Sequence, residues 1–298
     1  GVVPALVLLV GMCFVPETPR WLLSKGRLKE CRKVLQKIEP ENTVNDLIGQ
    51  MEVEIEKDRN SAVGWRYLMQ PWLRTPLMIA VCIMFFQQFV GINTVIYYSP
   101  KIFLMAGFES TLSAIWASVG IGIVNVVFTV ISLYLVDRIG RRKLYFIGLS
   151  GIAFSVLCLS ACFIYANQLG EIGRWLMVIF MFGYVAFFAI SIGPLGWLVI
   201  SEIFPQKVRG LGTSIGSLAV WIFNCIVSFT FFKIIDFFSI PGTEIVVGQT
   251  TSENPAGAFF LYGFIAVLGL VWGYLFLPET KGLSLEEIEQ KWRKNREC

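Results

Sequence analysis

The sequence has no histidine, and only 15% of its 298 residues are charged. Without histidine, the usual general acid or base and most zinc and haem ligands are missing, so the sequence indicates no enzyme, no metal site and no cofactor. Soluble domains carry about 25% charged residues, whereas this chain has a mean hydropathy of +0.67. The composition therefore predicts an all-α polytopic membrane protein.

Two other patterns are also missing. The seven cysteines are odd in number and lie mostly in apolar runs, which argues against a disulfide framework. Cys158 and Cys162 are one helical turn apart, but no carboxylate lies near them, so packing explains them. The basic residues form no aromatic-interleaved stripe, which argues against a nucleic-acid partner.

Long apolar runs are what the chain has instead. They are continuous rather than alternating, which favours helices over a membrane β-barrel. Residues 1–16 are predicted to be the end of one spanning helix, and because the chain opens inside this run without Met we expect a longer protein. Six complete spans are predicted at 77–99, 110–136, 143–166, 174–201, 211–234 and 256–277.

The positive charges predict the orientation. Every Lys and Arg except Lys101, Arg174 and Lys233 falls on one side of the membrane if the spans alternate. Basic loops stay in the cytoplasm, so we expect residues 17–74 and the C-terminal tail to be cytoplasmic. The expected location is the plasma (inner) membrane. Four parts follow, namely 1–16, a cytoplasmic helical loop at 17–74, a six-helix transmembrane bundle at 75–277, and a cytoplasmic tail helix at 278–298.

Three amides stand inside the span from Leu77 to Tyr98, namely Gln87, Gln88 and Asn93. An unsatisfied polar group in hydrocarbon is costly, and an interhelical hydrogen bond returns only about 0.6–2 kcal/mol. A wet, ligand-accepting cavity would explain them; the alternative is that they clasp neighbouring helices. On an unbroken helix Gln88 and Asn93 would lie about 140° apart, so Gly91 is predicted to break the helix and re-aim Asn93.

A second break is predicted within the span 174–201, at Gly193, Pro194 and Gly196. Proline cannot donate to the carbonyl four residues earlier, so a hinge is expected here. Trp197 could offer an indole surface to a ligand, or it could simply pack against lipid or a helix. Asn125, in the span 110–136, has two equally supported interpretations: it lines a cavity, or it joins neighbouring helices by a hydrogen bond.

Charged residues cluster at two cytoplasmic turns. Asp137, Arg141 and Arg142 lie in the first, and Glu202 and Arg209 in the second. The simpler interpretation is topological, with positive charge holding a hairpin inside the cell. The sharper one is an ion-pair network that locks one conformation.

Six motifs in this order resemble the sugar porter family of the major facilitator superfamily. They are Pro16–Leu22, Gln87–Asn93 with Tyr97 and Tyr98, Asp137–Arg142, Gly193–Trp197, Ser201–Pro205 with Arg209 and Gly210, and Pro278–Gly282. The resemblance covers the whole chain. It implies the family's C-terminal half: the end of helix six, the intracellular helical loop, helices seven to twelve and the tail.

The resemblance also implies roles for individual residues. Sugar-binding residues would be Gln87, Gln88, Asn93, Asn125, Trp197, Trp221 and Asn224. The external gate would be Tyr97 and Tyr98, with hinges at Gly91, Gly193, Pro194 and Gly196. The cytoplasmic charge lock would be Glu17, Arg20, Asp137, Arg141, Arg142, Glu202, Arg209 and Glu279.

By this resemblance the function is transport of a monosaccharide, a hexose or pentose, by alternating access and sugar–proton symport. The alternatives are a uniporter for sugars or polyols and a non-transporting sugar sensor. The six spans contain no Asp or Glu, so a proton carrier would lie in a missing N-terminal half, the chain's expected partner besides sugar and lipid. Two departures stand out: Val220 replaces a family amide, and the external loop 236–255 is long.

Overall fold

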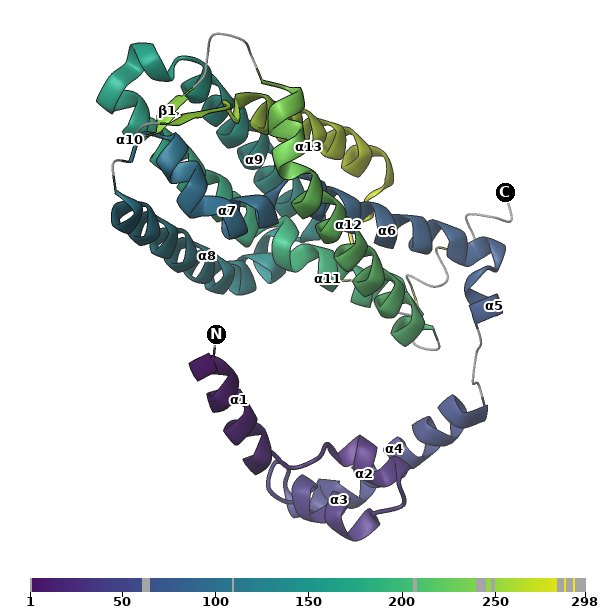
Figure 1. The fold of residues 1–298 in the computed structure, drawn as a ribbon. Helices are drawn as coiled ribbons and strands as arrows, with labels where there is room; N and C mark the ends of the chain where they lie inside the picture. The colour runs from purple at the N-terminus through teal and green to yellow at the C-terminus, as the bar shows by residue number, and fades with distance from the viewer. Residues whose placement is uncertain are drawn as a thin grey trace. The chain divides into compact units, whose positions relative to one another are not determined.

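The computed structural model describes residues 2–60, 65–108, 110–205, 208–239, 245–247, 250–282, 287 and 292. The chain divides into two compact units, Gly1–Gly64 and Trp65–Cys298 (Figure 1). The sequence had placed this boundary between residues 74 and 75. The predicted tail helix at 278–298 lies largely outside the described residues.

The first unit has four helices: α1 (Val2–Phe14), α2 (Pro19–Ser24), α3 (Leu28–Leu35) and α4 (Glu41–Asn60). Thr18 caps α2 by accepting a hydrogen bond from the Trp21 amide, and Pro19 occupies the first helical position, which needs no donor. The helices α2, α3 and α4 share a small core of Leu22, Leu23, Cys31, Leu35, Val44 and Ile48.

The second unit begins with the short helices α5 (Trp65–Leu68) and η1 (Pro71–Leu73). The long helices follow: α6 (Arg74–Phe89), α7 (Ile92–Met105), α8 (Thr111–Ile139), α9 (Arg141–Ile164), α10 (Ala166–Ile190), α11 (Ile192–Ile203), α12 (Arg209–Phe237) and α13 (Ala256–Phe276). Because α6 and α7 form one span and α10 and α11 another, the described residues contain six candidate spans. This agrees with the six predicted spans.

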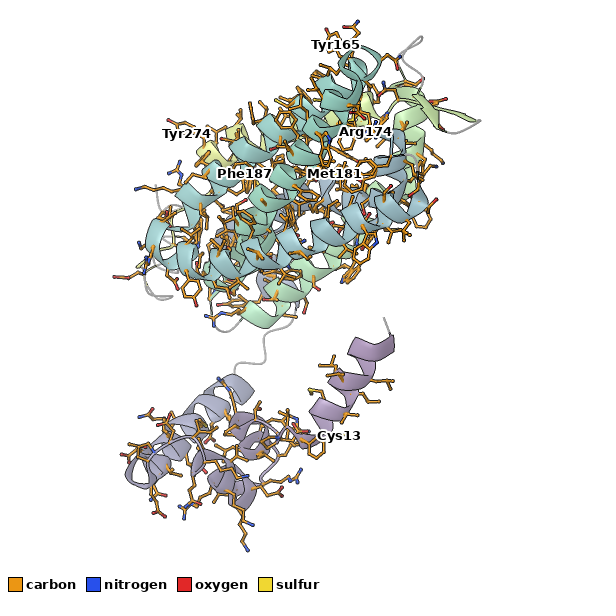
Figure 2. The ribbon with its side chains drawn as sticks, turned by 90° about the vertical axis from the view of Figure 1, so that its left-hand side faces the viewer. Cys13, Tyr165, Arg174, Met181, Phe187 and Tyr274 are labelled. Atoms are coloured by element: carbon orange, nitrogen blue, oxygen red, sulfur yellow. The ribbon has the colours of Figure 1, made fainter. Side chains whose placement is uncertain are left out.

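Helix α9 is among the most enclosed of these spans. It packs between α10 and α13, with Leu149, Ile152 and Val156 fully buried. Figure 2 shows α10 running from near Tyr165, at one end of the bundle, through Met181 to Phe187. In contrast, α8 leaves most of its apolar side chains exposed, so one long face of this span has no partner in the described chain.

The long loop 236–255 contains a short hairpin. Strands β1 (Ile245–Val247) and β2 (Thr250–Ser252) pair antiparallel. After them Asn254 fastens the loop to the bundle: its amide nitrogen donates to the Phe163 carbonyl at 2.8 Å, and its oxygen accepts from the Ala256 amide at 2.9 Å. The loop thus has structure of its own and a buried anchor at the start of α13.

Candidate functional site

The first helix break lies at Gly91, between α6 and α7, where the sequence predicted it. Its φ of +86° is in the left-handed region that favours glycine, and a Cβ here would overlap the ring of Tyr262. The Val90 carbonyl, at the end of α6, accepts a hydrogen bond from the buried Tyr184 hydroxyl at 2.9 Å. Neighbouring helices therefore hold the break in place.

The three amides around this break form one hydrogen-bonded relay. Asn93 Nδ2 donates to Gln88 Oε1 at 2.5 Å, and Gln88 Nε2 donates to Gln87 Oε1 at 3.1 Å. Gln87 Nε2 donates in turn to the backbone carbonyls of Ile192 and Gly193, at 3.1 and 2.8 Å. The break has brought Gln88 and Asn93 together, and the relay joins the two broken spans.

The second break lies at Ser191, where φ is −127° and ψ is −104°. The sequence had placed it within Ile192–Trp197, but Pro194 sits in the first turn of α11, where the helix tolerates proline. Proline still leaves the Ile190 carbonyl without its usual donor. Ser132 Oγ, from α8, donates to that carbonyl at 2.8 Å.

A pocket of about 300 Å³ opens between the two breaks, within the usual range for small-molecule sites. Its polar lining is Gln87, Gln88, Asn93, Asn125 and Thr129. Its other lining residues are Ile92, Ile96, Phe188, Gly193, Pro194, Trp197 and Val220. The pocket thus combines amides that pair with hydroxyl groups and an indole that can pack against C–H groups.

Trp197 belongs to the lining of this pocket and of a second one. The indole is 41% exposed and lines both spaces. The second pocket, about 380 Å³, is mainly apolar and is also lined by Ser132, Leu133, Val136, Pro194, Leu198 and Ser201. Pro194 and Trp197 line both pockets, so the two spaces adjoin along α11.

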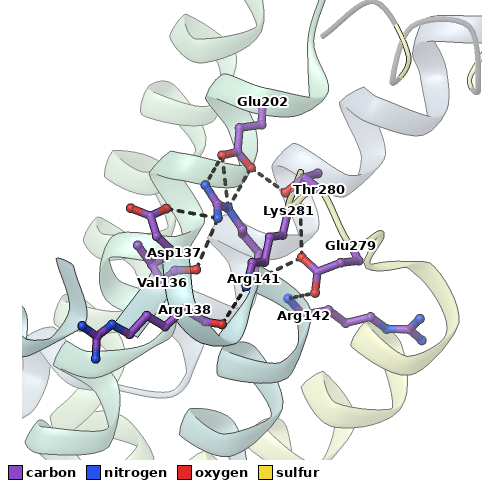
Figure 3. Close-up of polar contacts among 9 residues, drawn as sticks. All are labelled: Val136, Asp137, Arg138, Arg141, Arg142, Glu202, Glu279, Thr280 and Lys281. Carbon is purple, nitrogen blue, oxygen red and sulfur yellow. Dashed lines mark hydrogen bonds and ion pairs between the residues drawn. The ribbon is translucent and has the colours of Figure 1, made fainter. Parts of the chain in front are cut away.

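The charged turns form a network at one end of the second unit (Figure 3). Arg141 Nη2 lies 2.8 Å from Glu202 Oε1, and Arg141 Nη1 lies 3.3 Å from Asp137 Oδ1. Thr280 Oγ1 also donates to Glu202. The Arg141 and Glu202 side chains are only 12% and 19% exposed, so water screens their attraction weakly.

Glu279 belongs to the same network but acts as a helix cap. Its carboxylate accepts from the backbone amides of Arg141 and Arg142, at 3.0 and 3.2 Å, at the positive end of α9 (Figure 3). Gly140 makes room for it: φ is +95°, and a Cβ would lie 2.9 Å from a Glu279 oxygen. The Arg142 side chain donates to the Tyr274 carbonyl instead.

Comparison with known proteins identifies the family. The model of the family described as "Sugar (and other) transporter" matches residues 1–292. The chain belongs to this family of sugar transporters. The sequence resemblance to sugar porters of the major facilitator superfamily is thereby confirmed, and the chain is an integral membrane protein.

Several sugar transporters are similar over nearly the whole chain. The glucose transporter GlcP of Staphylococcus epidermidis is 36% identical over 98% of this chain and 61% of its own length. The D-xylose-proton symporter of Escherichia coli is 34% identical over 97% of this chain and 55% of its own. The probable polyol transporter 3 of Arabidopsis thaliana is 33% identical, over 96% and 58%.

Solved structures of a sugar transporter are also similar to this chain. The proton:xylose symporter XylE bound to 6-bromo-6-deoxy-D-glucose aligns with a TM-score of 0.71 at 33% identity, over 97% of this chain and 57% of that structure. A double-tryptophan variant of XylE gives 0.73 at 34% identity. The chain therefore spans a little over half the length of the sugar transporters that it matches.

Two residues that the resemblance placed at the sugar lie off the pocket. Trp221, on α12, is 66% exposed, while its neighbour Val220 lines the pocket. Asn224 is buried, but its Nδ2 lies 3.4 Å from the Tyr97 hydroxyl, and its oxygen accepts from Ser228. In this chain, α12 thus presents valine to the pocket and uses its asparagine to reach α7.

The expected gate residues tie α7 to α12. Tyr98 stacks on Phe231 with ring centroids 5.4 Å apart, and its hydroxyl lies 3.4 Å from the Ser228 carbonyl. One turn further, the Lys101 ammonium lies 4.0 Å from the centre of the Phe232 ring. Their part in gating remains a prediction.

Three further residues are expected members of the charge lock, namely Arg209, Glu17 and Arg20. Arg209 Nε and Nη2 are buried and find no hydrogen-bond partner among the described residues, so Arg209 does not pair with Glu202. Glu17 and Arg20 belong to the first unit, Gly1–Gly64. Their role in a lock remains a prediction.

Sequence reasoning missed Tyr184, Tyr262 and Ser132, which hold the two breaks. A buried tyrosine hydroxyl needs a hydrogen-bond partner, so a lone tyrosine in an apolar span is a usable signal. That signal indicates only that some polar group lies nearby. It does not identify the group that accepts the hydrogen bond, because donor and acceptor come from different helices, as with Tyr184 and the Val90 carbonyl.

Proposed function

We propose that this chain forms the C-terminal half of a transporter that moves a hexose or pentose across the plasma membrane by alternating access. The proposed mode is sugar–proton symport. The observation that carries the proposal is the pocket between two broken spans, lined by amides and Trp197. Transporter sites are commonly built from broken helices near the middle of the membrane.

The relatives support sugars and polyols as the substrate class, and one of them is a proton symporter. A glucose transporter, a D-xylose-proton symporter and a probable polyol transporter have similar identity to this chain. Facilitated diffusion of a sugar or polyol is therefore the second candidate. The pocket itself is lined by amide, hydroxyl and apolar groups, so a proton carrier for symport is proposed to lie in an N-terminal half.

We assign the sugar contacts within this pocket to Gln88, Asn93, Asn125 and Trp197. A second six-helix half would complete the site by covering the exposed face of α8. The network around Arg141 and Glu202 would close the cytoplasmic side. In this scheme the two halves rock around the sugar, and no covalent chemistry occurs.

Uptake of sugars by the complete transporter tests the proposal. Radiolabelled D-glucose, D-xylose and L-arabinose would be offered to cells expressing the wild type and Gln88→Ala. Losing one neutral hydrogen bond is expected to raise the KM about 2- to 12-fold. Gln168→Ala, on an exposed part of α10, is the matched control and should transport like the wild type.

Two results would contradict the proposal. If the wild type transports none of the three sugars, the function is wrong. If Gln88→Ala leaves the KM of every transported sugar unchanged, the site is misassigned. Comparing uptake with and without a proton gradient then separates symport from uniport.

The proposed orientation has its own prediction. Lys101→Cys, at the outer end of α7, should react with a membrane-impermeant maleimide added to intact cells, whereas Glu39→Cys, after α3, should react only after the cells are opened. Both substitutions would be made in a protein from which the exposed native cysteines Cys13 and Cys225 have been removed. The reverse labelling pattern would show that the loop 17–74 is external.

A further inference from the structure

We propose that a basic face of the first unit binds the anionic phospholipid headgroups of the cytoplasmic leaflet. This basic face consists of residues on α3 and in the turns that flank it, namely Lys25, Lys29, Arg32, Lys33 and Lys37. The inference goes beyond sugar transport, but it uses the proposed orientation, in which residues 17–74 are cytoplasmic. Its partner is a lipid surface rather than a dissolved anion.

Charge is unevenly distributed within the first unit. Residues 19–37, which include α2 and α3, contain seven basic residues and one acidic residue. Residues 41–56, in α4, contain five acidic residues and no basic one. Because α3 and α4 share one small apolar core, the unit has a basic helix and an acidic helix side by side rather than a mixed surface.

Helical geometry places the basic side chains on one side of α3. At about 100° per residue, Lys29, Arg32 and Lys33 lie within about 100° of one another. They face away from Cys31 and Leu35, which are buried in the core. All three are exposed, and so are the two lysines in the flanking turns. The five cations are therefore open to a partner outside the unit.

The protein itself does not neutralise this face. None of its four lysines forms an ion pair with another described residue. The acidic residue of the segment, Glu30, pairs instead with Arg27, at 2.6 Å. Arg32 donates to a neutral acceptor, Asn45 Oδ1, at 2.5 Å, so its charge stays unbalanced. Clustered charge of one sign attracts a partner of the opposite sign.

The neighbouring segments favour a membrane as that partner. Helix α1, which comes directly before α2, is apolar, and its side chains from Ala5 to Phe14 are exposed. Trp21 and Leu28, close in sequence to the lysines, are 40% and 44% exposed. Tryptophan and basic residues at the end of an apolar helix are typical of the membrane–water interface. The cytoplasmic leaflet carries anionic lipids, which attract basic segments close to the membrane.

Lipid-specific quenching in the complete transporter tests the proposal. Gln36→Cys, which is exposed on the same side of α3, would carry a bimane fluorophore in a protein that lacks the exposed Cys13 and Cys225. Vesicles of phosphatidylcholine would contain a small share of spin-labelled phosphatidylglycerol or, separately, of spin-labelled phosphatidylcholine. One lysine near an anionic surface is worth about 5-fold in affinity, so phosphatidylglycerol should quench at least about 5-fold more strongly.

Charge variants and salt identify the cause. Replacing all four lysines of the basic face with glutamine should remove the preference for phosphatidylglycerol. Raising the salt from about 0.01 to about 1 M should also remove it, because the screening length falls from about 30 to about 3 Å. The matched charge variant is Asp46→Asn with Glu52→Gln and Glu56→Gln, which changes exposed acids of α4 and should keep the preference.

A second label position tests whether the effect is local. Asp46 is exposed on the side of α4 opposite the buried Val44 and Ile48, so it faces away from the core that α3 shares. A bimane at Asp46→Cys should show no preference for phosphatidylglycerol. An equal preference at both label positions would mean that no particular face binds the lipid, and would overturn the inference.

Two further results would contradict it. Equal quenching by the two lipids at low salt, or a preference that survives the four lysine substitutions, would show that the basic face does not select anionic lipid. Quenching by neither lipid would place the face in the cytosol, with an acidic protein segment as its partner. The measurement uses no sugar, so a protein that transports none of the tested sugars would fail the proposed function and leave this inference standing.

Discussion

The carbonyl of Val90 lies within an apolar helix bundle and depends on one side chain for its hydrogen bond. The helix stops at this residue because Gly91 takes a left-handed conformation. In hydrocarbon, an unpaired carbonyl costs several kcal/mol. The Tyr184 hydroxyl, on the neighbouring span, removes that cost.

Tyr184→Phe is therefore expected to destabilise the transporter by about 1–3 kcal/mol, because it leaves a buried carbonyl without a donor and changes little else. Thermal unfolding of the purified complete protein would show a lower midpoint. Tyr165→Phe, which changes an exposed tyrosine, is the matched control and should leave the midpoint unchanged. Equal midpoints for Tyr184→Phe and the wild type would show that another donor replaces the hydroxyl.

For individual residues, the sequence showed which side chains are unusual, but it did not show which groups they form hydrogen bonds with. Gln87, Gln88 and Asn93 stand out because amides are rare in apolar spans. Their relay ends on carbonyls more than a hundred positions along the chain, which no local pattern identifies. Trp221 and Val220 show the same limit, since one step along a helix rotates a side chain by about 100°.

The two breaks differ in how their helices are interrupted. At Gly91 the backbone conformation ends the helix. At Ser191 the helix is interrupted just before a turn that contains Pro194, and Ser132 supplies the donor that proline lacks. The composition of the segment Ile192–Trp197 predicted a break, which the structure has directly before that segment, because glycine and proline tolerate an early helical position.

A double-mutant cycle tests this compensation. Ser132→Ala alone is expected to lower the free energy of unfolding by about 1–3 kcal/mol, because the Ile190 carbonyl loses its donor. Pro194→Ala restores a backbone N–H four residues after that carbonyl, so the cost of Ser132→Ala should shrink in this background. A coupling of at least about 0.5 kcal/mol is expected from thermal unfolding of the four proteins.

If the two substitutions change the free energy of unfolding additively, the Ser132 hydroxyl does not replace the backbone donor that Pro194 lacks. Ser201→Ala is the matched control for the serine. Its hydroxyl donates to the Leu198 carbonyl within its own helix, at 2.7 Å, so its removal should cost the same with and without Pro194.

Across the whole molecule, the charge network joins helices that are far apart in sequence. Arg141 begins α9, Glu202 lies near the end of α11, and Glu279 follows α13 (Figure 3). Ion pairs on an open surface contribute little. This pair is largely shielded from water, so it should be stronger and depend less on salt.

Glu202→Gln is expected to destabilise the complete transporter by about 1.5–3 kcal/mol, the usual contribution of hydrogen bonds to a charged group. Asp137→Asn is the matched control: its side chain is 76% exposed, so the loss should stay below about 1 kcal/mol. Thermal unfolding at low and high salt measures both. An equal loss for the two variants would show that burial of the pair has no effect.

The sequence by itself determined the class of the molecule and the number of its spans. Hydropathy and the distribution of Lys and Arg act along the chain, so a linear reading captures them. It also predicted a cavity at Gln88, Asn93 and Trp197, which line one pocket, because polar and aromatic residues in a broken span are unusual whatever surrounds them.

Only the tertiary structure decided which side chains meet. It joined Gln87 to α11, gave the carbonyls at the breaks their hydroxyl donors, and turned Val220 rather than Trp221 to the pocket. It made Glu279 the cap of α9 and left Arg209 out of the network among the described residues. Each of these outcomes depends on helix rotation and on contacts between distant segments, which hydrophobic pattern and motif do not specify.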